Sequence, residues 1–446
     1  MKKKKGDHSQ NQATTRRRFL QQSTAIGLIS SGYFVNPVVG KPSSSPNERL
    51  RIAAVGATNR AGANIRGCAS QDIVAIADVD GNLLEQGSAA YPNARKYRDY
   101  RVMLEKEAET IDAVLVGTPD HSHAPASAMA LRLKKHVYCE KPLTHTVYEA
   151  RVLSDLAREN KLVTQMGTQI HAGDNYRRVV ELIQGNAIGP VNEVHVWSSA
   201  VYTGGKFRTD VPCPANVDWD LWLGPAPERP YSPDVHPFAW RRFWDYGAGS
   251  LGDFGCHYMD LAHWALDLKH PVKIDAHGPE VDAVSTPAWC KVQYDYPSRG
   301  EMPAAKLFWY DSGKKPELLS TLKNKKGEPL NWNSGQLFVG ENGMLLSDYG
   351  RHVLLPEDKF EDFERPEPTI PKSIGHHTEW IEAIKNGGTT TCNFDYSGAL
   401  TEAVLLGTIS YRSGKTIEWD AETLKVTNAP EAQPLIHKEY RKGWTL

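Results

Sequence analysis

Short apolar runs alternate with helical patterns from Leu50 to Gln169, and this alternation constrains the fold more than any other feature of the sequence. The apolar runs are LRIAAVGA (50–57), DIVAIADVD (72–80), IDAVLVGTPDHSH (111–123, ending in a polar turn), HVYCEKPL (136–143) and LVTQMGTQ (162–169). A strand buried on both faces of a sheet reads as such a run. Helices between successive strands require parallel pairing. We therefore expect an α/β fold that begins with a doubly wound parallel sheet.

The first of these units has the pattern of a dinucleotide-binding site. A glycine-bearing turn, GATNRAG (56–62), follows the first run, and Asp78 follows the apolar part of the second. Glycine lets the main chain approach a pyrophosphate, a helix N-terminus offers N–H groups, and the carboxylate binds ribose hydroxyls. We expect Gly56, Thr58, Asn59, Arg60 and Asp78 to contact the cofactor, although Thr58 replaces the second glycine of the G-x-G-x-x-G pattern. The acidic Asp78 favours NAD over NADP, because it would repel a 2′-phosphate.

Further polar side chains follow the other predicted strands, at the carboxyl ends where ligands bind in such sheets. Those predicted to contact the cofactor are Thr118, Pro119, His121, His123, Glu140, Lys141 and Gln169. His121 and His123 also raise the question of a metal. Zinc needs further ligands, and the sequence assigns no carboxylate to act beside these two histidines. We therefore predict no metal site.

Five segments together resemble the Gfo/Idh/MocA oxidoreductase family. They are VGATNRAG (55–62), ADVD (77–80), GTPDHSH (117–123), CEKPL (139–143) and GSLGDFGCHYMDLAHWAL (249–266). The resemblance implies an N-terminal NAD-binding Rossmann domain, residues 49–168. It also implies a C-terminal α/β domain, residues 169–446, with an open and mainly antiparallel sheet for substrate binding and oligomerisation. The implied partners are a carbohydrate or cyclitol substrate and further copies of the chain.

The same resemblance assigns catalytic roles to three residues. Lys141 matches the family lysine that contacts the reacting hydroxyl or carbonyl, and Asp253 and His257 match the family's D-x-x-x-H pair. The i, i+4 spacing places both side chains on one face if the segment is helical. A histidine, whose ordinary pKa is about 6.5, can accept the hydroxyl proton. The lysine ammonium stabilises a developing alkoxide, and Asp253 orients the imidazole or binds a substrate hydroxyl.

The segment from Val201 to Gly249 is long, irregular and rich in proline and tryptophan. The tryptophans in and before it are Trp197, Trp219, Trp222, Trp240 and Trp244. Two interpretations remain open: the rings stack on the C–H faces of a sugar, or they pin the loop onto the core. As substrate contacts we predict Tyr176, Arg177, Trp240 and Arg241.

The first forty residues have the features of an export signal. A basic start and the segment TRRRFL (15–20) precede a weakly apolar stretch, as in a twin-arginine signal. Polar residues interrupt the stretch, which makes it unsuited to span a membrane. We expect a signal peptide over 1–40, a linker over 41–48, and a periplasmic protein without stable membrane insertion after processing.

The net charge of −1 argues against nucleic-acid binding.

Three functional hypotheses follow. The leading one is an exported NAD-dependent oxidoreductase that transfers a hydride between a nicotinamide cofactor and a sugar or cyclitol hydroxyl. The second is a glycosidase or lyase that uses tightly bound NAD in a transient oxidation, elimination and reduction cycle, which suits a compartment where free cofactor is scarce. The third is a sugar-binding or assembly protein on the same fold, against which Lys141 and His257 argue.

Overall fold

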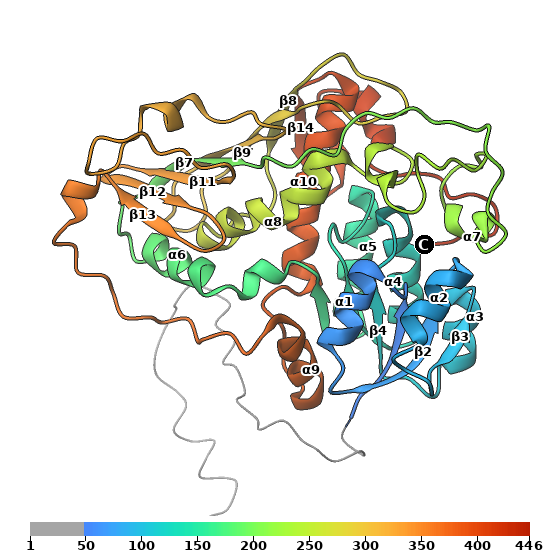
Figure 1. The fold of residues 1–446 in the computed structure, drawn as a ribbon. Coiled ribbons are helices and arrows are strands. Elements are labelled where there is room, and N and C mark those ends of the chain that lie inside the picture. Colours follow the sequence, from blue (N-terminus) through green and yellow to red (C-terminus); the bar gives the residue numbers. More distant parts are fainter. Residues whose placement is uncertain (1–48) are drawn as a thin grey trace, which may run out of the picture. The chain divides into compact units, whose positions relative to one another are not determined.

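The computed structural model describes residues 49–446, so the predicted signal peptide and linker lie outside the described residues. The first part contains a six-stranded parallel sheet in the order β3-β2-β1-β4-β5-β6 (Figure 1). Its strands are β1 (Arg51–Val55), β2 (Asp72–Ala77), β3 (Arg95–Tyr97), β4 (Ala113–Val116), β5 (His136–Cys139) and β6 (Thr164–Met166). Its helices are α1 (Asn59–Gly67), α2 (Gly81–Ser88), α3 (Tyr100–Glu107), α4 (His123–Arg132) and α5 (Val147–Glu159). The order confirms the doubly wound Rossmann arrangement, in which ligands bind where the order reverses between β1 and β4.

Strand β1 is buried on both faces, which is why its sequence shows no alternation. Ala53 and Val55 belong to one hydrophobic core, and Ile52 and Ala54 belong to a second core on the other face. Trp380, which is fully buried, belongs to this second core and comes from α9 (His376–Asn386). A helix far along the chain therefore completes the packing of the first sheet.

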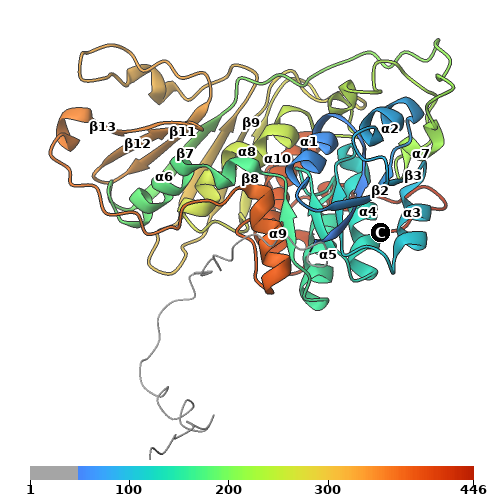
Figure 2. The ribbon, with the colours of Figure 1, turned by 60° about the horizontal axis from the view of Figure 1, so that its bottom comes forward.

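The second part contains a nine-stranded sheet in the order β13-β12-β11-β7-β10-β9-β8-β14-β15. Its strands are β7 (Val191–Trp197), β8 (Lys273–His277), β9 (Lys291–Tyr296), β10 (Ala305–Tyr310), β11 (Gly335–Gly340), β12 (Gly343–Ser347), β13 (His352–Leu355), β14 (Ile417–Asp420) and β15 (Lys425–Val426). Strands β7 and β10 pair in parallel, and the other pairs are antiparallel. Helices α8 (Gly249–Ala265) and α10 (Phe394–Ser413) pack on this sheet, with α6 (Asp174–Gln184) beside α8 (Figure 2). The predicted mainly antiparallel sheet is confirmed.

Helix α8 carries both predicted catalytic residues of the second part, although it is rich in glycine. A glycine in a helix interior costs about 1 kcal/mol relative to alanine. Gly255 lies so close to α10 that an added Cβ would be 2.7 Å from the Val404 side chain. Close packing of the two helices therefore offsets the weak helix propensity. Asp253 and His257 consequently stand one turn apart on a regular helix.

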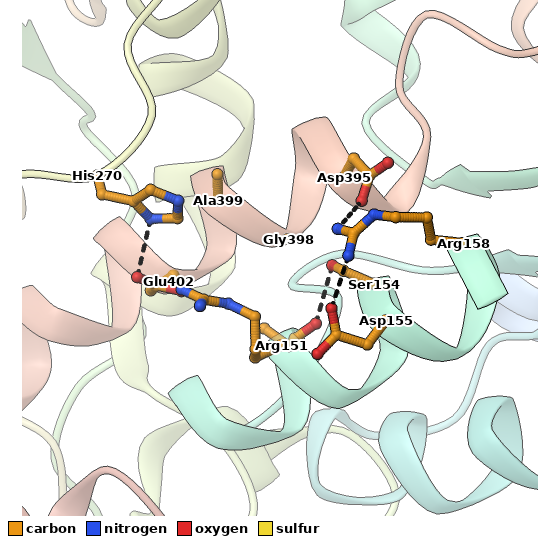
Figure 3. A pocket seen from close by; sticks show the side chains of 10 residues that line it. Arg151, Ser154, Asp155, Arg158, His270, Asp395, Gly398, Ala399 and Glu402 are labelled. Atoms are coloured by element: carbon orange, nitrogen blue, oxygen red, sulfur yellow. Dashed lines mark hydrogen bonds and ion pairs between the residues drawn. The ribbon is translucent and has the colours of Figure 1, made fainter. Parts of the chain in front are cut away.

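Helices α5 and α10 also pack side by side, and charged side chains line a hollow of about 200 Å³ at this contact (Figure 3). Arg151 Nη2 and His270 Nδ1 each lie 2.9 Å from the Glu402 carboxylate. Arg158 bonds to Asp155 at 2.8 Å and to Asp395 at 2.6 Å. The charges in this hollow pair with one another, and none of the predicted site residues lines it. The hollow is thus a polar junction between two helices.

The segment between β7 and α8 is mostly irregular and contains α7 (Trp219–Leu223) and a short turn, η5 (Ala239–Arg242). Trp222, Trp240, Phe243 and Tyr246 form its own hydrophobic cluster, and none is more than 6% exposed. Trp219 stacks on Trp222 with ring centroids 4.6 Å apart. These contacts favour the interpretation that the tryptophans pin the loop.

Within residues 49–446, no helix combines the length and apolar character needed to cross a bilayer.

Candidate active site

The turn after β1 is shaped to bring main chain close to a ligand. Gly56 has φ of +97°, and an added Cβ would lie 2.9 Å from the Ala61 Cβ. Only glycine adopts this conformation without strain. The Thr58 side chain makes no capping bond to α1, so it leaves the first N–H groups of that helix uncapped. Asn59 and Arg60 are exposed beside them, and this arrangement fits a pyrophosphate.

Asp78 is fixed directly against this turn. Its Oδ2 accepts a hydrogen bond from Ala57 N at 3.0 Å, and its Oδ1 accepts one from Asp80 N at 2.9 Å. Burial raises the pKa of the Asp78 carboxyl to about 6. The Asp80 carboxylate instead caps α2, because it accepts a hydrogen bond from Asn82 N at 2.8 Å. Of these two acidic residues, Asp78 is therefore the one placed to receive ribose hydroxyls.

Two further predicted cofactor contacts lie at the end of β4. Thr118 and Pro119 are half-buried. The Thr118 hydroxyl oxygen is buried, and it makes no hydrogen bond to any residue between 49 and 446. A buried hydroxyl without a partner is uncommon in native structures. Its position beside the turn fits a cofactor that supplies the missing hydrogen bond.

Glu140, which directly follows β5, contacts three side chains at the same edge of the sheet. Its Oε1 accepts hydrogen bonds from Asn64 Nδ2 at 2.9 Å and from Gln169 Nε2 at 3.0 Å, and it lies 3.9 Å from Arg60 Nε. Burial raises the pKa of this carboxyl. Gln169 also donates to the Tyr138 hydroxyl at 2.9 Å. The predicted residues Arg60, Glu140 and Gln169 thus form one connected group.

Lys141 bridges the two parts of the structure. Its ammonium donates to Asp253 Oδ1 at 2.6 Å and to the Asp253 main-chain oxygen at 2.8 Å. Arg241 Nε donates to the same Oδ1 at 2.7 Å. Burial would raise the pKa of Asp253, but the Lys141 ammonium and the Arg241 guanidinium hold it well below its usual range. The Asp253 carboxylate therefore forms ion pairs with two cations, Lys141 and Arg241.

His257 lies one turn beyond Asp253 and is half-buried. Its Nδ1 makes no hydrogen bond within the part of the chain that the structure describes. Burial and the nearby Lys141 ammonium lower the pKa of the imidazole to about 3. The ring is therefore neutral at pH 7, and a proton taken from a substrate would not stay on it.

The structure corrects the expectation that His121 and His123 contact the cofactor. The two residues are 0% and 1% exposed. His121 Nε2 lies 2.9 Å from the Trp222 carbonyl, and the His123 ring nitrogens lie 2.8 Å from the carbonyls of Thr118 and Pro142. Both rings hold the main chain around the site and offer no surface to a ligand.

The predicted substrate contacts are also partly corrected. Tyr176 is 0% exposed, and its hydroxyl donates to the His257 carbonyl at 3.2 Å. Arg177 is buried, and its Nη1 donates to the Pro371 carbonyl at 3.1 Å. Trp240 is buried in the loop cluster. Of the four predicted contacts, Arg241 alone joins the Lys141 and Asp253 group, with its guanidinium 4.1 Å above the Trp240 ring.

Three aromatic residues that sequence reasoning missed surround these cations. Phe254 stacks on Tyr202 with centroids 5.9 Å apart, and Phe238, which is 58% exposed, lies 6.5 Å from Tyr202. The Lys141 ammonium lies 5.9 Å from the Phe254 ring, and the Arg241 guanidinium lies 5.4 Å from the Phe238 ring. We call Tyr202, Phe238 and Phe254 the aromatic wall. Phe254 lies between Asp253 and His257, and Tyr202 and Phe238 lie in the irregular segment 201–249, where attention went to the tryptophans.

His171, Asp260 and Cys392 form a buried group of possible metal ligands near α8. His171 Nδ1 lies 2.9 Å from one Asp260 oxygen, and the Tyr396 hydroxyl donates to that oxygen at 2.7 Å. Burial raises the pKa of the Cys392 thiol, which opposes the thiolate form that metals bind. Hydrogen bonds thus join His171 and Tyr396 to Asp260, whereas the buried His171 Nε2 has no partner among residues 49–446.

Two family descriptions match the chain. One is the oxidoreductase family's NAD-binding Rossmann fold, over residues 50–168, and the other is its C-terminal alpha/beta domain, over residues 191–302. Among curated relatives, the inositol 2-dehydrogenase of Salmonella typhimurium is 25% identical over 126 residues, which are 28% of this chain and 37% of that protein. The levoglucosan dehydrogenase of Pseudarthrobacter phenanthrenivorans is 24% identical over 198 residues, 43% of this chain and 42% of that protein. The chain thus spans about two fifths of the length of these relatives.

Solved structures share the fold at low sequence identity. The WlbA dehydrogenase of Chromobacterium violaceum, in complex with NADH and UDP-GlcNAcA, superposes with a TM-score of 0.58 at 15% identity, covering 86% of this chain and 99% of that one. GenD2 from gentamicin A biosynthesis, in complex with NAD, gives 0.56 at 18% identity over 89% of this chain and 100% of that one. Because the two family descriptions together match more than half of the chain, this protein belongs to the Gfo/Idh/MocA oxidoreductase family, whose first domain is an NAD-binding Rossmann fold.

Proposed function

We propose that this protein is an NAD-dependent dehydrogenase that transfers a hydride between NAD and a hydroxyl group of a sugar or cyclitol. The observation that carries the proposal is the contact between Lys141, at the carboxyl end of the Rossmann sheet, and Asp253 on α8. This contact puts an ammonium beside the edge where the family binds NAD. The matches to an inositol 2-dehydrogenase and a levoglucosan dehydrogenase support the substrate class.

In this proposal the Rossmann edge holds the cofactor and Lys141 acts on the substrate. The turn at Gly56 and the start of α1 bind the pyrophosphate, and Asp78 binds the adenosine ribose. When bound, NAD supplies the acceptor for the hydride. The Lys141 ammonium has three N–H groups, two of which are directed at Asp253. The third is available to the substrate oxygen, where it stabilises the negative charge that develops as the hydride leaves.

The aromatic wall is the surface that we propose for the sugar ring. Its rings present apolar faces next to the cations of Lys141 and Arg241. Aromatic faces stack on the C–H faces of a sugar, and charged groups bind its hydroxyls. The 58% exposure of Phe238 agrees with a ligand-binding role, because large exposed aromatic side chains often mark binding surfaces.

The test compares Lys141→Met with Lys106→Met, a control at an exposed position of α3. Both variants and the natural chain are assayed for NADH formation with a panel that includes myo-inositol and levoglucosan. We expect Lys141→Met to lose at least a hundredfold in kcat while its calorimetric affinity for NAD stays unchanged. The control should behave like the natural chain. Full turnover by Lys141→Met would contradict the proposed role.

A second candidate function is a glycosidase or lyase cycle on retained NAD. The favouring observation is a segment of the long loop that binds across the end of β2, close to Asp78. Gly81 N donates to the Asn216 carbonyl at 2.8 Å, and Asp218 N donates to the Val79 carbonyl at 3.0 Å. A cofactor covered by this segment would exchange slowly with free NAD. Slow exchange would suit a reaction cycle that returns the bound NAD to its starting oxidation state. Release of nitrophenol from a nitrophenyl glycoside without accumulation of NADH would favour this function.

We also propose export by the twin-arginine pathway, which the segment TRRRFL (15–20) supports. Replacing the three arginines by lysine should keep the full chain in the cytoplasmic fraction, whereas the natural chain should reach the periplasmic fraction.

We further propose a homo-oligomer. Phe308 and Tyr310 support it, because they lie on the face of β10 opposite to its buried side chains. A monomeric mass by light scattering would contradict this second proposal.

A further inference from the structure

Arg241, in the turn η5, has one bound inner nitrogen and two unbound outer nitrogens. Its Nε donates to Asp253 Oδ1 at 2.7 Å. Its Nη1 and Nη2 donate no hydrogen bond to any residue between 49 and 446. They are not enclosed, because they are not among the buried polar atoms that lack a partner and the side chain is 19% exposed. The outer edge of the guanidinium therefore reaches solvent with its N–H groups free.

Aromatic rings fix the orientation of this guanidinium. Its central carbon lies 4.1 Å from the ring centroid of Trp240, 5.4 Å from that of Phe238 and 5.6 Å from that of Tyr202. Cation–π attraction to these rings and the bond to Asp253 oppose rotation of the side chain. Binding would therefore cost little further side-chain entropy, so the free edge is pre-organised for a ligand.

The charged groups around Arg241 leave one positive charge uncompensated. Lys141 and Arg241 share one counter-ion, the Asp253 carboxylate. Asp120, in the turn η3 (Asp120–Ser122) after β4, also acts on the Arg241 charge, but no hydrogen bond or ion pair joins these two side chains within residues 49–446. The buried Asp120 Oδ2 has no hydrogen-bond partner in this part of the chain, and burial raises the pKa of the carboxyl to about 8. At pH 7 two cations thus face one carboxylate.

Glu140, the other buried carboxyl group of this edge, pairs with different groups. Its Oε1 accepts hydrogen bonds from Asn64 Nδ2 at 2.9 Å and Gln169 Nε2 at 3.0 Å, and it lies 3.9 Å from Arg60 Nε. No ion pair joins it to Arg241 within the described residues. Burial raises the pKa of Glu140, which disfavours its charged form. Glu140 therefore does not supply the missing counter-charge.

A carboxylate matches the free edge of this arginine. The guanidinium is planar, and its outer N–H groups can donate two parallel hydrogen bonds to the two oxygens of a carboxylate. Hydrogen bonds to a charged acceptor are about twice as strong as those to a neutral hydroxyl. A carboxylate also carries the single negative charge that the site lacks, whereas a phosphate monoester carries about −1.5 to −2 at pH 7.

We propose that Arg241 is a specificity-determining residue that binds a carboxylate group of the substrate, which makes the substrate a sugar acid or a carboxylated cyclitol. This inference rests on the proposed dehydrogenase function. Lys141 Nζ and Arg241 Nε donate to the same Asp253 oxygen, at 2.6 and 2.7 Å, and so lie no farther apart than the sum of these distances. The bound carboxylate and the hydroxyl at Lys141 therefore belong to the same sugar or cyclitol unit.

The first arm of the test measures binding without turnover. The full chain saturated with NADH is titrated calorimetrically with methyl β-D-glucuronide, methyl α-D-galacturonide and quinate, and with the uncharged primary amide of each. These compounds have no free carbonyl to be reduced, and NADH cannot accept a hydride. We expect at least one acid to bind at least about tenfold more tightly than its amide.

Three variants assign this preference to Arg241. Arg241→Lys keeps the charge but removes the fork, and should lose about tenfold in affinity for the acid. Arg241→Gln should bind the acid and its amide alike. The matched control is Arg242→Gln, at the exposed next position of the same turn, and it should keep the natural preference. Unchanged affinity for NADH excludes a folding defect, and Arg241→Lys, which can still pair with Asp253, tests the fork even if Arg241→Gln unfolds.

The second arm measures NADH formation from NAD with the same compounds and their neutral parent sugars. In the natural chain, kcat/KM for the preferred acid should exceed that for its amide at least about tenfold, and Arg241→Gln should lose this difference. Equal affinity for acid and amide, no binding of any acid, or a preference that persists in Arg241→Gln would overturn the role of Arg241.

The outcomes separate the two levels of the proposal. Acid binding that depends on Arg241, without NADH formation from any compound, would contradict the dehydrogenase function and leave the carboxylate site. Oxidation of neutral sugars and acids at equal kcat/KM would leave the dehydrogenase function and contradict the carboxylate site.

Discussion

The Asp253 carboxylate offers a sharp test of the electrostatics of the site. In Asp253→Asn the Lys141 and Arg241 cations lose their common counter-charge, which lies 2.6 and 2.7 Å from them. The side chains of Lys141 and Asp253 are 8% and 6% exposed, whereas that of Arg241 is 19% exposed and partly screened by water. Removing one partner from a buried ion pair costs about 3–5 kcal/mol. We therefore expect the low end, a loss of about 3 kcal/mol in the free energy of unfolding.

The expected loss depends on pH in a defined direction. The pKa of Asp253 is lower in the folded protein than its ordinary value, which is about 3.9 in an unfolded chain. The carboxylate therefore stabilises the fold at pH values above about 4, and this contribution is lost as the pH falls toward the folded pKa. The difference between the natural chain and Asp253→Asn should be full at pH 7 and should shrink below pH 4.

The assay is urea unfolding followed by tryptophan fluorescence at pH 7 and at pH 3.5. The matched control is Asp155→Asn, which removes the same charge from the Arg158 pair on α5, where the side chains are 45% and 60% exposed. An exposed pair of this kind contributes about 0.5 kcal/mol or less. If Asp253→Asn lost no more stability than this control at pH 7, the reasoning about the buried carboxylate would be wrong.

Three further predictions concern the cofactor edge and α5. Gly56→Ala should weaken NAD binding at least tenfold by calorimetry, because its Cβ has no room. As the control for this change, Gly387→Ala, at an open position after α9 with φ of +66°, should lose about 1 kcal/mol of stability with unchanged NAD affinity. Asp78→Ser should lower the ratio of NAD to NADP affinity in paired titrations, and an unchanged ratio would refute the ribose role. Thr146→Ala should destabilise the protein by about 1 kcal/mol in urea unfolding, because it removes the capping box formed with Glu149.

The regular elements were predictable where local pattern and tertiary context agree. A helix between the fourth and fifth apolar runs was expected, and α5 (Val147–Glu159) begins there at a capping box formed by Thr146 and Glu149. The predicted strand over 162–169 is shorter, Thr164–Met166, since the chain turns at Gly167, where an added Cβ would lie 2.7 Å from Glu140. The local sequence pattern does not predict such a close approach between segments that are distant along the chain.

The site was predictable by position but not by orientation. Placement at strand ends and the D-x-x-x-H spacing indicated Lys141 and Asp253, which the structure brings into contact. The same rule of position also selected His121 and His123, but their rings turn toward main-chain carbonyls. Asp120 lies between two residues of that same motif and was passed over, because its isolation from hydrogen-bond partners is a three-dimensional property. The aromatic wall was missed for a similar reason, since its members are distant in sequence.

The contribution of α9 to the first sheet limits how the nucleotide-binding domain can be excised. A fragment that ends near residue 168 would expose Ile52, Ala54 and Leu115 to water, because the Trp380 side chain that shares their core would be missing. Such a fragment should aggregate or bind a chaperone. A stand-alone module would have to carry residues 376–386 grafted onto it, or be made by circular permutation that brings this helix next to β1.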